Sequence, residues 1–404
     1  MHTNFYELLS ESQRKVLRLI GTAASVLSVN SYLVGGSVRD LIMGVKIRDI
    51  DISVESINVR EFCEFMETSF GAQILRFSEF GTCKLTLGGE IVDVAMTRSE
   101  TYEPQGSLPT VKYADIDMDL ARRDFSINSM AVPILPSELG SIIDPNQGLE
   151  DIRREVIRVL HSRSFVDDST RIFRAVRYSV RLEFELENET NELLMNSVQD
   201  IGNISGTRTL NEIIRICHEP QAGSMLKKLN SVGVFKAIHP KFVLPSYFGG
   251  NCNDDCKEAW SNVEICCLLL FDSDMEYWES IAHSMDMPKA VLKALTGLEI
   301  MKNLGEHKRN SDIYQSLISV PQEALNVGIK CLDKTKSAEV KFFRDNLKGR
   351  HLSITGDDLI SLGVEPGPLV GHLLDQVFAA LLNGDVQGRD SELEFVKSLL
   401  LAHC

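Results

Sequence analysis

Several features that would indicate a membrane or secreted protein are missing from this sequence of 404 residues. No apolar run approaches the ~18 residues that a membrane-spanning helix needs. The first residues lack the basic and then apolar pattern of a signal peptide. The nine cysteines are an odd number and lack the spacing of a disulfide framework. We therefore expect a cytoplasmic protein with reduced cysteines and no membrane partner.

Positive charge is also in short supply. Lysine and arginine total 42 against 57 aspartates and glutamates, which gives a net charge of −15. This balance argues against a protein that binds polyanions by overall attraction. The segment from Ala121 to Arg181 differs, because its ten arginines exceed its eight acidic residues. Hydrophobic residues make up 44% of the chain, enough for a globular protein with two to four domains.

A glycine turn follows a short apolar run near the N-terminus. Residues Tyr32 to Val34 have the character of a buried strand, and Gly35 and Gly36 let the backbone turn sharply and approach a ligand. A helix is predicted over residues 37–43, and its first N–H groups suit a triphosphate. Arg39 adds a positive charge one turn into that helix. This segment predicts a phosphate-binding turn.

Two carboxylates follow at once in a segment with strand periodicity. Asp49 and Asp51 are two apart, so on a strand they point to the same face, roughly 6.5–7 Å apart. Carboxylates in this arrangement can hold one or two magnesium ions and align a nucleotide for attack. A glycine pair or an Asp-x-Asp motif alone is common in proteins without this chemistry. Together, in this order, they predict a nucleotidyltransferase.

Asp93 is a candidate for a third carboxylate. The segments 82–87 and 90–96 are predicted to form a hairpin through Gly88 and Gly89. An aspartate on such a strand can simply face solvent. If its strand pairs beside the Asp49–Asp51 strand, Asp93 becomes able to bind metal or to orient an attacking hydroxyl.

Arginines dominate the next two motifs. Arg123, in the motif Arg-Arg-Asp-Phe-Ser-Ile-Asn that starts at residue 122, could hold a triphosphate with its planar guanidinium. Further along, four arginines recur at helical spacing and occupy a stripe about 120° wide. They are Arg171, Arg174, Arg177 and Arg181. Alone, this stripe would be a solvated basic face.

Two acidic residues precede the stripe, and either could cap the predicted helix: Asp167 and Asp168. Asp168 could accept a hydrogen bond from an exocyclic amine while Arg171 donates to the ring, so the pair could read a base without a template. Cytosine and adenine carry that amine, whereas uracil and guanine present a carbonyl. Arg208 and Glu212 are four apart on a later helix and are expected to brace it against the stripe.

The remaining pattern predicts an α+β unit with a modest sheet that ends near residue 158, followed by helices from about residue 167. Other elements expected in the first part are helices over 5–27 and 57–70, a strand over 128–134 and a loop over 102–112.

Taken in order, these motifs resemble those of class II tRNA nucleotidyltransferases, a family that also includes bacterial poly(A) polymerases. The resemblance is strong over residues 30–220, and the segment 354–368 is similar to the C-terminal part of many members. It implies a polymerase-β-like head with a small mixed sheet, followed by an all-helical neck, body and tail. The expected limits are 1–158 for the head, 159–235 for the neck, 236–350 for the body and 351–404 for the tail.

The resemblance also implies an activity: template-independent addition of C and A from CTP and ATP to a tRNA 3′ end, with two Mg²⁺ ions and release of pyrophosphate. By motif position, Asp49 and Asp51 would bind metal, and the body and tail would bind the acceptor and T-stem minihelix of tRNA. The triphosphate would contact Gly36, Arg39 and Arg123, beside Gly35. The base would lie among Asp168, Arg171, Arg174 and Arg177.

Departures from the family pattern are mild. Asp167 stands where glutamate is usual and Ser169 where many members have proline, while Asp168 and Arg171 are intact. The His-Asp metal motif of the extra phosphohydrolase domain is missing from the C-terminal half, and so is the long basic extension of poly(A) polymerases. The alternatives are an enzyme that adds only CC or only A, a poly(A) polymerase, or an inactive RNA-binding protein. The loop over 102–112 does not decide between them, and the oligomeric state is left open.

Overall fold

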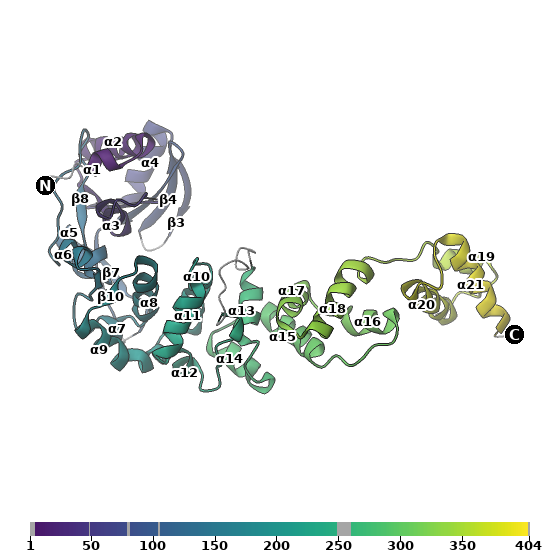
Figure 1. Ribbon diagram of the computed structural model, residues 1–404. Coiled ribbons are helices and arrows are strands. Elements are labelled where there is room, and N and C mark those ends of the chain that lie inside the picture. The colour runs from purple at the N-terminus through teal and green to yellow at the C-terminus, as the bar shows by residue number, and fades with distance from the viewer. Residues whose placement is uncertain (1–4, 48, 79–80, 104–105, 249–259, 403–404) are drawn as a thin grey trace. The chain divides into compact units, whose positions relative to one another are not determined.

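The computed structural model describes residues 5–47, 49–78, 81–103, 106–248 and 260–402. The chain divides into two compact units, residues 1–238 and 239–404, each with its own interior (Figure 1). Across the described ranges, no helix is both long and apolar enough to cross a membrane. The finer division into head, neck, body and tail stays a prediction.

A six-stranded mixed sheet is the centre of unit 1. Among the described strands of this sheet, β2 and β5 pair in parallel, and every other pair of adjacent strands is antiparallel. The strand order is β3-β4-β5-β2-β1-β8. The bounds are β1 Ser31–Val34, β2 Ile50–Val54, β3 Gln73–Phe77, β4 Thr82–Leu87, β5 Glu90–Met96 and β8 Ala131–Pro133.

The two faces of this sheet differ because side chains alternate along each strand. Ile50 and Ile52 of β2 lie beside Val92 and Val94 of β5, and all four are buried. The helices α2 (Glu11–Val26) and α4 (Val59–Phe70) both contact β5 and cover the apolar face (Figure 1). Asp51 alternates with the isoleucines and therefore points to the opposite face.

The helices predicted over residues 37–43 and 57–70 are present in unit 1, whereas the prediction for residues 5–27 needs correction. The single helix expected over residues 5–27 is two helices, because Ser10 accepts a hydrogen bond from the backbone N–H of Gln13 and caps a new helix there. The bounds are α1 Phe5–Leu8, α2 Glu11–Val26, α3 Gly36–Ile42, α4 Val59–Phe70, α5 Ile116–Ala121, α6 Gly148–Arg153, α7 Ser164–Asp167, α8 Thr170–Leu182, α9 Asn188–Ser197, α10 Gly206–Cys217, α11 Ala222–Ser231 and α12 Val234–Ile238.

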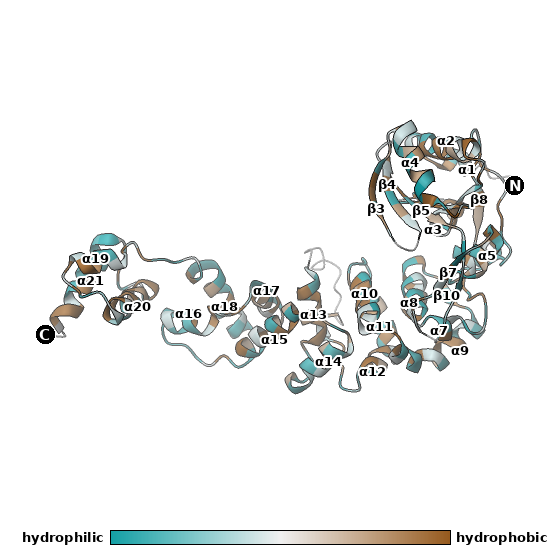
Figure 2. Cartoon of the chain, turned by 180° about the vertical axis from the view of Figure 1, so that it is seen from behind, coloured by the Kyte–Doolittle hydropathy of each residue, from teal (hydrophilic) through white to brown (hydrophobic). Residues whose placement is uncertain are grey.

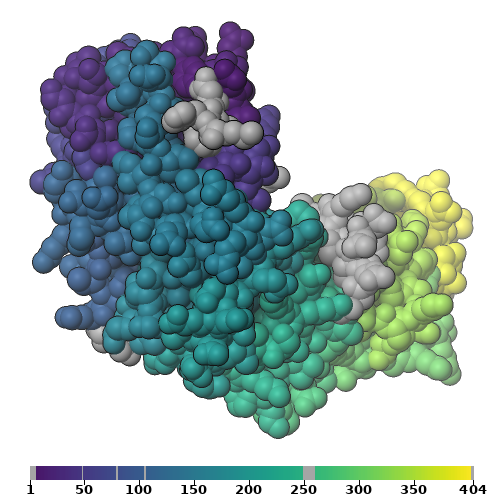
Figure 3. All heavy atoms as spheres, turned by 60° about the vertical axis from the view of Figure 1, so that its left-hand side comes forward, coloured from purple at the N-terminus to yellow at the C-terminus, as the bar shows by residue number. Residues whose placement is uncertain are grey.

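Two further predictions need correction. The loop expected over 102–112 is shorter, because β6 (Arg98–Thr101) pairs with β7 (Thr110–Tyr113) in a separate hairpin. Residues 104–105 of that loop lie outside the described residues. The segment 159–235, predicted as an all-helical neck, contains a short strand, since β10 (Glu185–Leu186) pairs with β9 (Val156–Ile157). Figure 3 shows the purple and blue segments of unit 1 packed against one another.

Unit 2 consists of helices and their connecting segments, with no strand among its described residues. Hydrophobic and hydrophilic stretches alternate along its helices (Figure 2), as expected where each helix buries one side. Its last part has a core of its own, which includes Leu359, Leu373, Val377 and Val396. The bounds are α13 Asn262–Leu270, α14 Trp278–Ser284, α15 Lys289–Lys302, α16 Asn310–Leu317, α17 Gln322–Cys331, α18 Lys334–Phe342, α19 Gly356–Ser361, α20 Pro368–Asn383 and α21 Arg389–Ala402. The α+β prediction, with a small mixed sheet followed by mainly helical structure, is confirmed.

Candidate active site

The predicted glycine turn lies at the edge of a cavity of about 1340 Å³ within unit 1. Gly35 has φ +64°, a left-handed conformation that favours glycine. A Cβ atom added there would lie 2.8 Å from Nη1 of Arg123. At Gly36, a Cβ would lie 3.8 Å from Oδ2 of Asp51. The turn therefore brings bare backbone next to both a carboxylate and a guanidinium.

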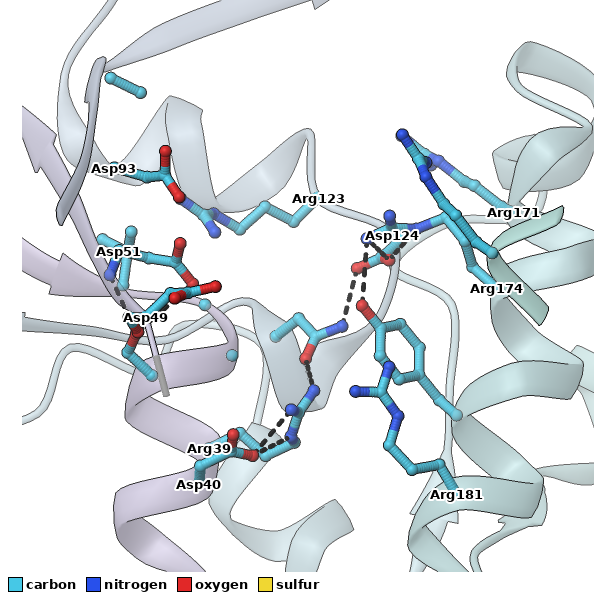
Figure 4. A pocket seen from close by; sticks show the side chains of 18 of the residues that line it. Arg39, Asp40, Asp49, Asp51, Asp93, Arg123, Asp124, Arg171, Arg174 and Arg181 are labelled. Carbon is cyan, nitrogen blue, oxygen red and sulfur yellow. Dashed lines mark hydrogen bonds and ion pairs between the residues drawn. The ribbon is translucent and has the colours of Figure 1, made fainter. Parts of the chain in front are cut away.

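The three candidate carboxylates line this one cavity. Asp51 and Asp93 are register partners across the parallel pair β2–β5, so the strand of Asp93 does lie beside that of Asp51. Asp49 is exposed and lies just before β2. Ser37 accepts a hydrogen bond from the backbone N–H of Asp51 at 3.0 Å and donates to the carbonyl of Asp49 at 3.0 Å. Figure 4 shows the three side chains grouped on one side of the pocket, with Arg123 extending toward them.

Asp51 carries a negative charge that its surroundings do not fully balance. Burial and then the charge of Asp93 raise the pKa of Asp51 to about 6, against the lowering influence of Arg123 and Ser37. A raised pKa in a carboxylate next to other carboxylates indicates a place where a cation would be stabilised.

Magnesium fits this donor set. Within the described residues, no three acidic, histidine or cysteine side chains form a ready-made metal site. Mg²⁺ in nucleotide enzymes is usually held by one or two carboxylates together with substrate phosphates and water. Asp49 and Asp51 beside a phosphate-sized turn match that pattern, with the substrate expected to supply the missing oxygens.

Arg123 is held in place by a residue that sequence reasoning missed. Asp119 is fully buried and accepts from Arg123 at 2.8 Å and from Arg122 at 2.7 Å. Burial alone would raise the pKa of Asp119, but the two guanidinium groups outweigh it and lower that pKa. Arg39 also lines the cavity, yet it is 4% exposed and donates to Asp40 and Asn128. Its guanidinium thus supports the glycine turn through these protein contacts.

Asp124 joins the sheet region to α8. Its carboxylate accepts from Arg174 at 2.6 Å and from the side-chain amide of Asn128 at 3.1 Å. Burial would raise the pKa of Asp124, but these partners lower it to about 2. Arg174 also lies over the ring of Tyr178, as do Arg39, Arg177 and Arg181, so Tyr178 is the aromatic centre of the arginine stripe.

Asp124→Asn is expected to lower the free energy of unfolding by roughly 2 kcal/mol at pH 7, because a carboxyl with a depressed pKa stabilises the fold only when ionised. The stabilisation is present above about pH 4 and is lost as pH falls toward about 2. The difference between wild type and variant in urea unfolding should therefore shrink over that interval. Glu150→Gln, at an exposed ion pair, is the control and should change little. A difference that stays constant between pH 4 and pH 2 would contradict the assignment.

Asp168 has one oxygen fixed and one open to the cavity. Its Oδ1 atom accepts from the backbone N–H of Thr170 at 3.0 Å, from the Thr170 hydroxyl at 2.6 Å and from Arg208 at 2.8 Å. No described residue donates to Oδ2. Arg171 is 4% exposed, and its terminal nitrogens donate to the Ser164 hydroxyl and the Arg122 carbonyl. Both residues line the cavity.

The remaining predicted residues are arranged differently from the sequence expectation. The helix α8 begins after Ser169, so Asp167 does not cap it and instead pairs with Arg163 at 3.1 Å. The expected pair Arg208–Glu212 does not form. Arg208 pairs with Asp168, at the end of α7, and Glu212 lies 3.6 Å from Arg177 of α8, so the two side chains tie α10 to α7 and to α8.

The stripe is not a solvated basic face. Arg171 and Arg177 are buried, and Arg174 and Arg181 have acidic partners. Lys84 was also missed: it lies opposite Asp93 and pairs with it at 3.0 Å. The alternation of residues 82–87 could have pointed to Lys84, since the hairpin register through Gly88 and Gly89 sets it across from Asp93.

Two family models match the chain. One, described as "Poly A polymerase head domain", matches residues 31–158, and the other, described as "Probable RNA and SrmB- binding site of polymerase A", matches residues 183–243. An A-adding tRNA nucleotidyltransferase of Geobacter sulfurreducens is 34% identical over 418 residues, which cover 95% of this chain and 47% of that protein. The A-adding tRNA nucleotidyltransferase of Halalkalibacterium halodurans is 28% identical over 401 residues, covering 96% and 93%. This chain thus spans about half the length of the first relative and nearly all of the second.

Solved structures agree over the whole chain. The Thermotoga maritima CCA-adding enzyme complexed with tRNA is 27% identical with a TM-score of 0.70, covering 98% of this chain and 97% of that one. Structures of CCA-adding enzyme with ATP and with CTP are 28% identical, with TM-scores of 0.75 and 0.74 and the same coverage. The ordered motifs, the shared fold and these matches lead to one conclusion: residues 31–158 are a poly(A) polymerase head domain and residues 183–243 match the RNA-binding region of the same polymerases, in a chain that is similar to tRNA nucleotidyltransferases over nearly its whole length.

Proposed function

We propose that the protein is a template-independent tRNA 3′-end nucleotidyltransferase that transfers a nucleotide from ATP or CTP and releases pyrophosphate. The observation that carries this proposal is that three carboxylates line one cavity beside the glycine turn: Asp51 and Asp93 on one sheet face, and Asp49 just before β2. Such a site is suited to a triphosphate and an attacking hydroxyl together. The relatives named for adding A to tRNA, and the solved complexes of CCA-adding enzyme with tRNA, ATP and CTP, support it.

In this proposal, Asp49 and Asp51 would hold two Mg²⁺ ions. When bound, the metal ions would neutralise the triphosphate and lower the pKa of the attacking hydroxyl. Asp93 lies one strand further and orients the 3′-hydroxyl of the acceptor. The hydroxyl loses its proton to water and its oxygen attacks the α-phosphorus. The bond from that phosphorus to the oxygen bridging the α- and β-phosphates breaks, and pyrophosphate leaves.

The arginines and the open carboxylate oxygen complete the proposed site. Arg123, held by Asp119, donates to the triphosphate oxygens. The Oδ2 atom of Asp168 accepts from the exocyclic amine of adenine or cytosine. Arg171 and Arg174 are fixed by protein partners, so we assign them to shaping the base site.

We propose the addition of A to a tRNA that ends in CC as the principal reaction, since both reported relatives are named A-adding. Addition of C is the second candidate, because the structural matches are CCA-adding enzymes. The head, neck, body and tail limits given above are part of this proposal, with the body and tail binding the acceptor and T-stem. A cytoplasmic location stays a prediction from the cysteine pattern.

The experiment that tests the activity uses tRNA transcripts ending at the discriminator base, at C and at CC. Each is incubated with Mg²⁺ and one labelled nucleotide at a time. An A-adding enzyme should extend only the CC transcript, with ATP, by one residue. Extension of all three with CTP or ATP in order would indicate complete CCA addition, and long A tails would indicate a poly(A) polymerase. No extension of any transcript would contradict the proposal.

A further inference from the structure

A second cavity of about 500 Å³ adjoins the candidate active site in unit 1. The two cavities share Thr82 and Asp93 in their walls. Three basic side chains line the second cavity: Arg76, Lys84 and Arg98. Leu108, Pro109 and Val111 form an apolar wall. The cavity therefore continues the active site beyond Asp93, which is the only acidic residue among those that line the second cavity.

Strand register places four charged residues in a single row across the sheet. Arg76 of β3 is the register partner of Lys84 of β4. Lys84 is the partner of Asp93 of β5, and Asp93 is the partner of Asp51 of β2. Register partners on neighbouring strands project to the same face, with strands about 4.8 Å apart. The row runs from two carboxylates to two cations, a polarity that suits metal at one end and phosphate at the other.

Two of the three basic side chains have acidic partners, and the third has none among the described residues. Arg98 pairs with Glu100 at 2.8 Å, and Lys84 pairs with Asp93 at 3.0 Å. Arg76 is exposed and has no counter-ion among the described residues. The protein has a net charge of −15 and therefore an excess of carboxylates. An arginine in a cavity wall without a counter-ion is positioned to attract an anion locally.

We infer that the second cavity binds the 3′-terminal strand of the polynucleotide acceptor, with Arg76 donating to one of its phosphodiester groups. This inference rests on the proposed function. In the proposed function the attacking hydroxyl lies at Asp93, which lines both cavities. The strand that carries this hydroxyl can therefore continue from Asp93 into the second cavity. Cations along a groove bind a phosphate backbone, and an apolar wall contacts the sugar and base faces.

Arg76→Gln tests the inference in the full-length protein. The side chain is exposed and unpaired among the described residues, so the variant is expected to fold normally. KM for a tRNA ending in CC should rise roughly tenfold, while kcat and KM for ATP stay unchanged. The slope of log affinity against log salt for the tRNA should also fall by about 0.7, the value for one phosphate contact on a single strand.

Two matched variants sharpen the result. Arg76→Lys keeps the charge and should restore most of the tRNA affinity. Arg153→Gln removes the same charge from an exposed position that lines neither cavity, and it should change nothing. An unchanged KM for tRNA and salt slope in Arg76→Gln would overturn the inference, as would a rise confined to KM for ATP. If wild-type protein extends no tRNA, the proposed function fails instead, and the two failures are thereby distinguished.

Discussion

Asp51→Asn is expected to reduce nucleotide incorporation by about a thousandfold or more while the protein remains folded. The amide has the shape of the carboxylate but no charge, and the loss of a metal ligand removes several kcal/mol of transition-state stabilisation. The measurement is single-turnover incorporation of labelled ATP into tRNA ending in CC, together with tRNA binding. The tRNA affinity should change little, because Asp51 faces the triphosphate end of the site.

The stability of Asp51→Asn distinguishes a metal-binding role of Asp51 from a purely structural one, because loss of a structural carboxylate would destabilise the protein. Folding raises the pKa of Asp51 to about 6, above its value in the unfolded chain, so the ionised carboxylate destabilises the metal-free fold above about pH 6. That cost is complete above about pH 6, shrinks as pH falls from about 6, and is gone below about pH 4, where the carboxyl is protonated in the unfolded chain as well. In metal-free buffer at pH 7, the Asn variant should therefore be at least as stable as wild type.

Two further variants complete the comparison. Asp49→Asn should lose activity in the same way, since Asp49 is exposed and its replacement leaves the core intact. Asp117→Asn, at an exposed acidic residue of the same unit that lines neither cavity, is the matched control and should retain full activity. Normal turnover in Asp51→Asn would contradict the metal-binding assignment.

Asp168→Asn is expected to weaken discrimination between nucleotides by about 10- to 100-fold, the range for one well-placed polar contact to a base. The carboxylate only accepts hydrogen bonds, so it favours the amines of adenine and cytosine and opposes the carbonyls of guanine and uracil. The amide can donate as well as accept, so UTP and GTP should gain relative to ATP and CTP. The measurement is kcat/KM for each of the four nucleotides with the same tRNA.

The neighbouring aspartate is the natural control. Asp167 is adjacent in sequence, lies outside the cavity wall and pairs with Arg163. Asp167→Asn should leave the ratios of kcat/KM unchanged. Because Asp168 also holds Arg208, a general loss of activity is expected in Asp168→Asn, and the ratios separate that effect from base reading. Selectivity that survives the change would contradict the base-reading assignment.

Local patterns predicted local structure well. Two glycines and an apolar run were enough to predict β1 and the turn at Gly35, and Gly88-Gly89 set the β4–β5 hairpin. Each of these depends on neighbours within a few residues. The helix break at Ser10 was missed because the apolar periodicity continues across it, although Ser10 followed by Gln13 is a capping-box pattern.

Contacts between residues that are far apart in the sequence could not be predicted from local patterns. Nothing local to Asp51 shows that its neighbour is Asp93, 42 residues later, in a parallel strand. Arg208 is a second example. Its spacing of four residues suggested a contact with Glu212, but its partner is Asp168, 40 residues away in the sequence. Buried acids such as Asp119 and Asp124 were passed over because their role depends on arginines that only the fold brings into contact.

The most direct test is a crystal structure of the protein with Mn²⁺ in place of Mg²⁺ and a non-hydrolysable ATP analogue, with the metal located by anomalous scattering. We predict manganese in direct contact with carboxylate oxygens of Asp49 and Asp51 and with the triphosphate, beside the Gly35–Gly36 turn. Manganese bound elsewhere, with a triphosphate that does not approach these two residues, would contradict the account.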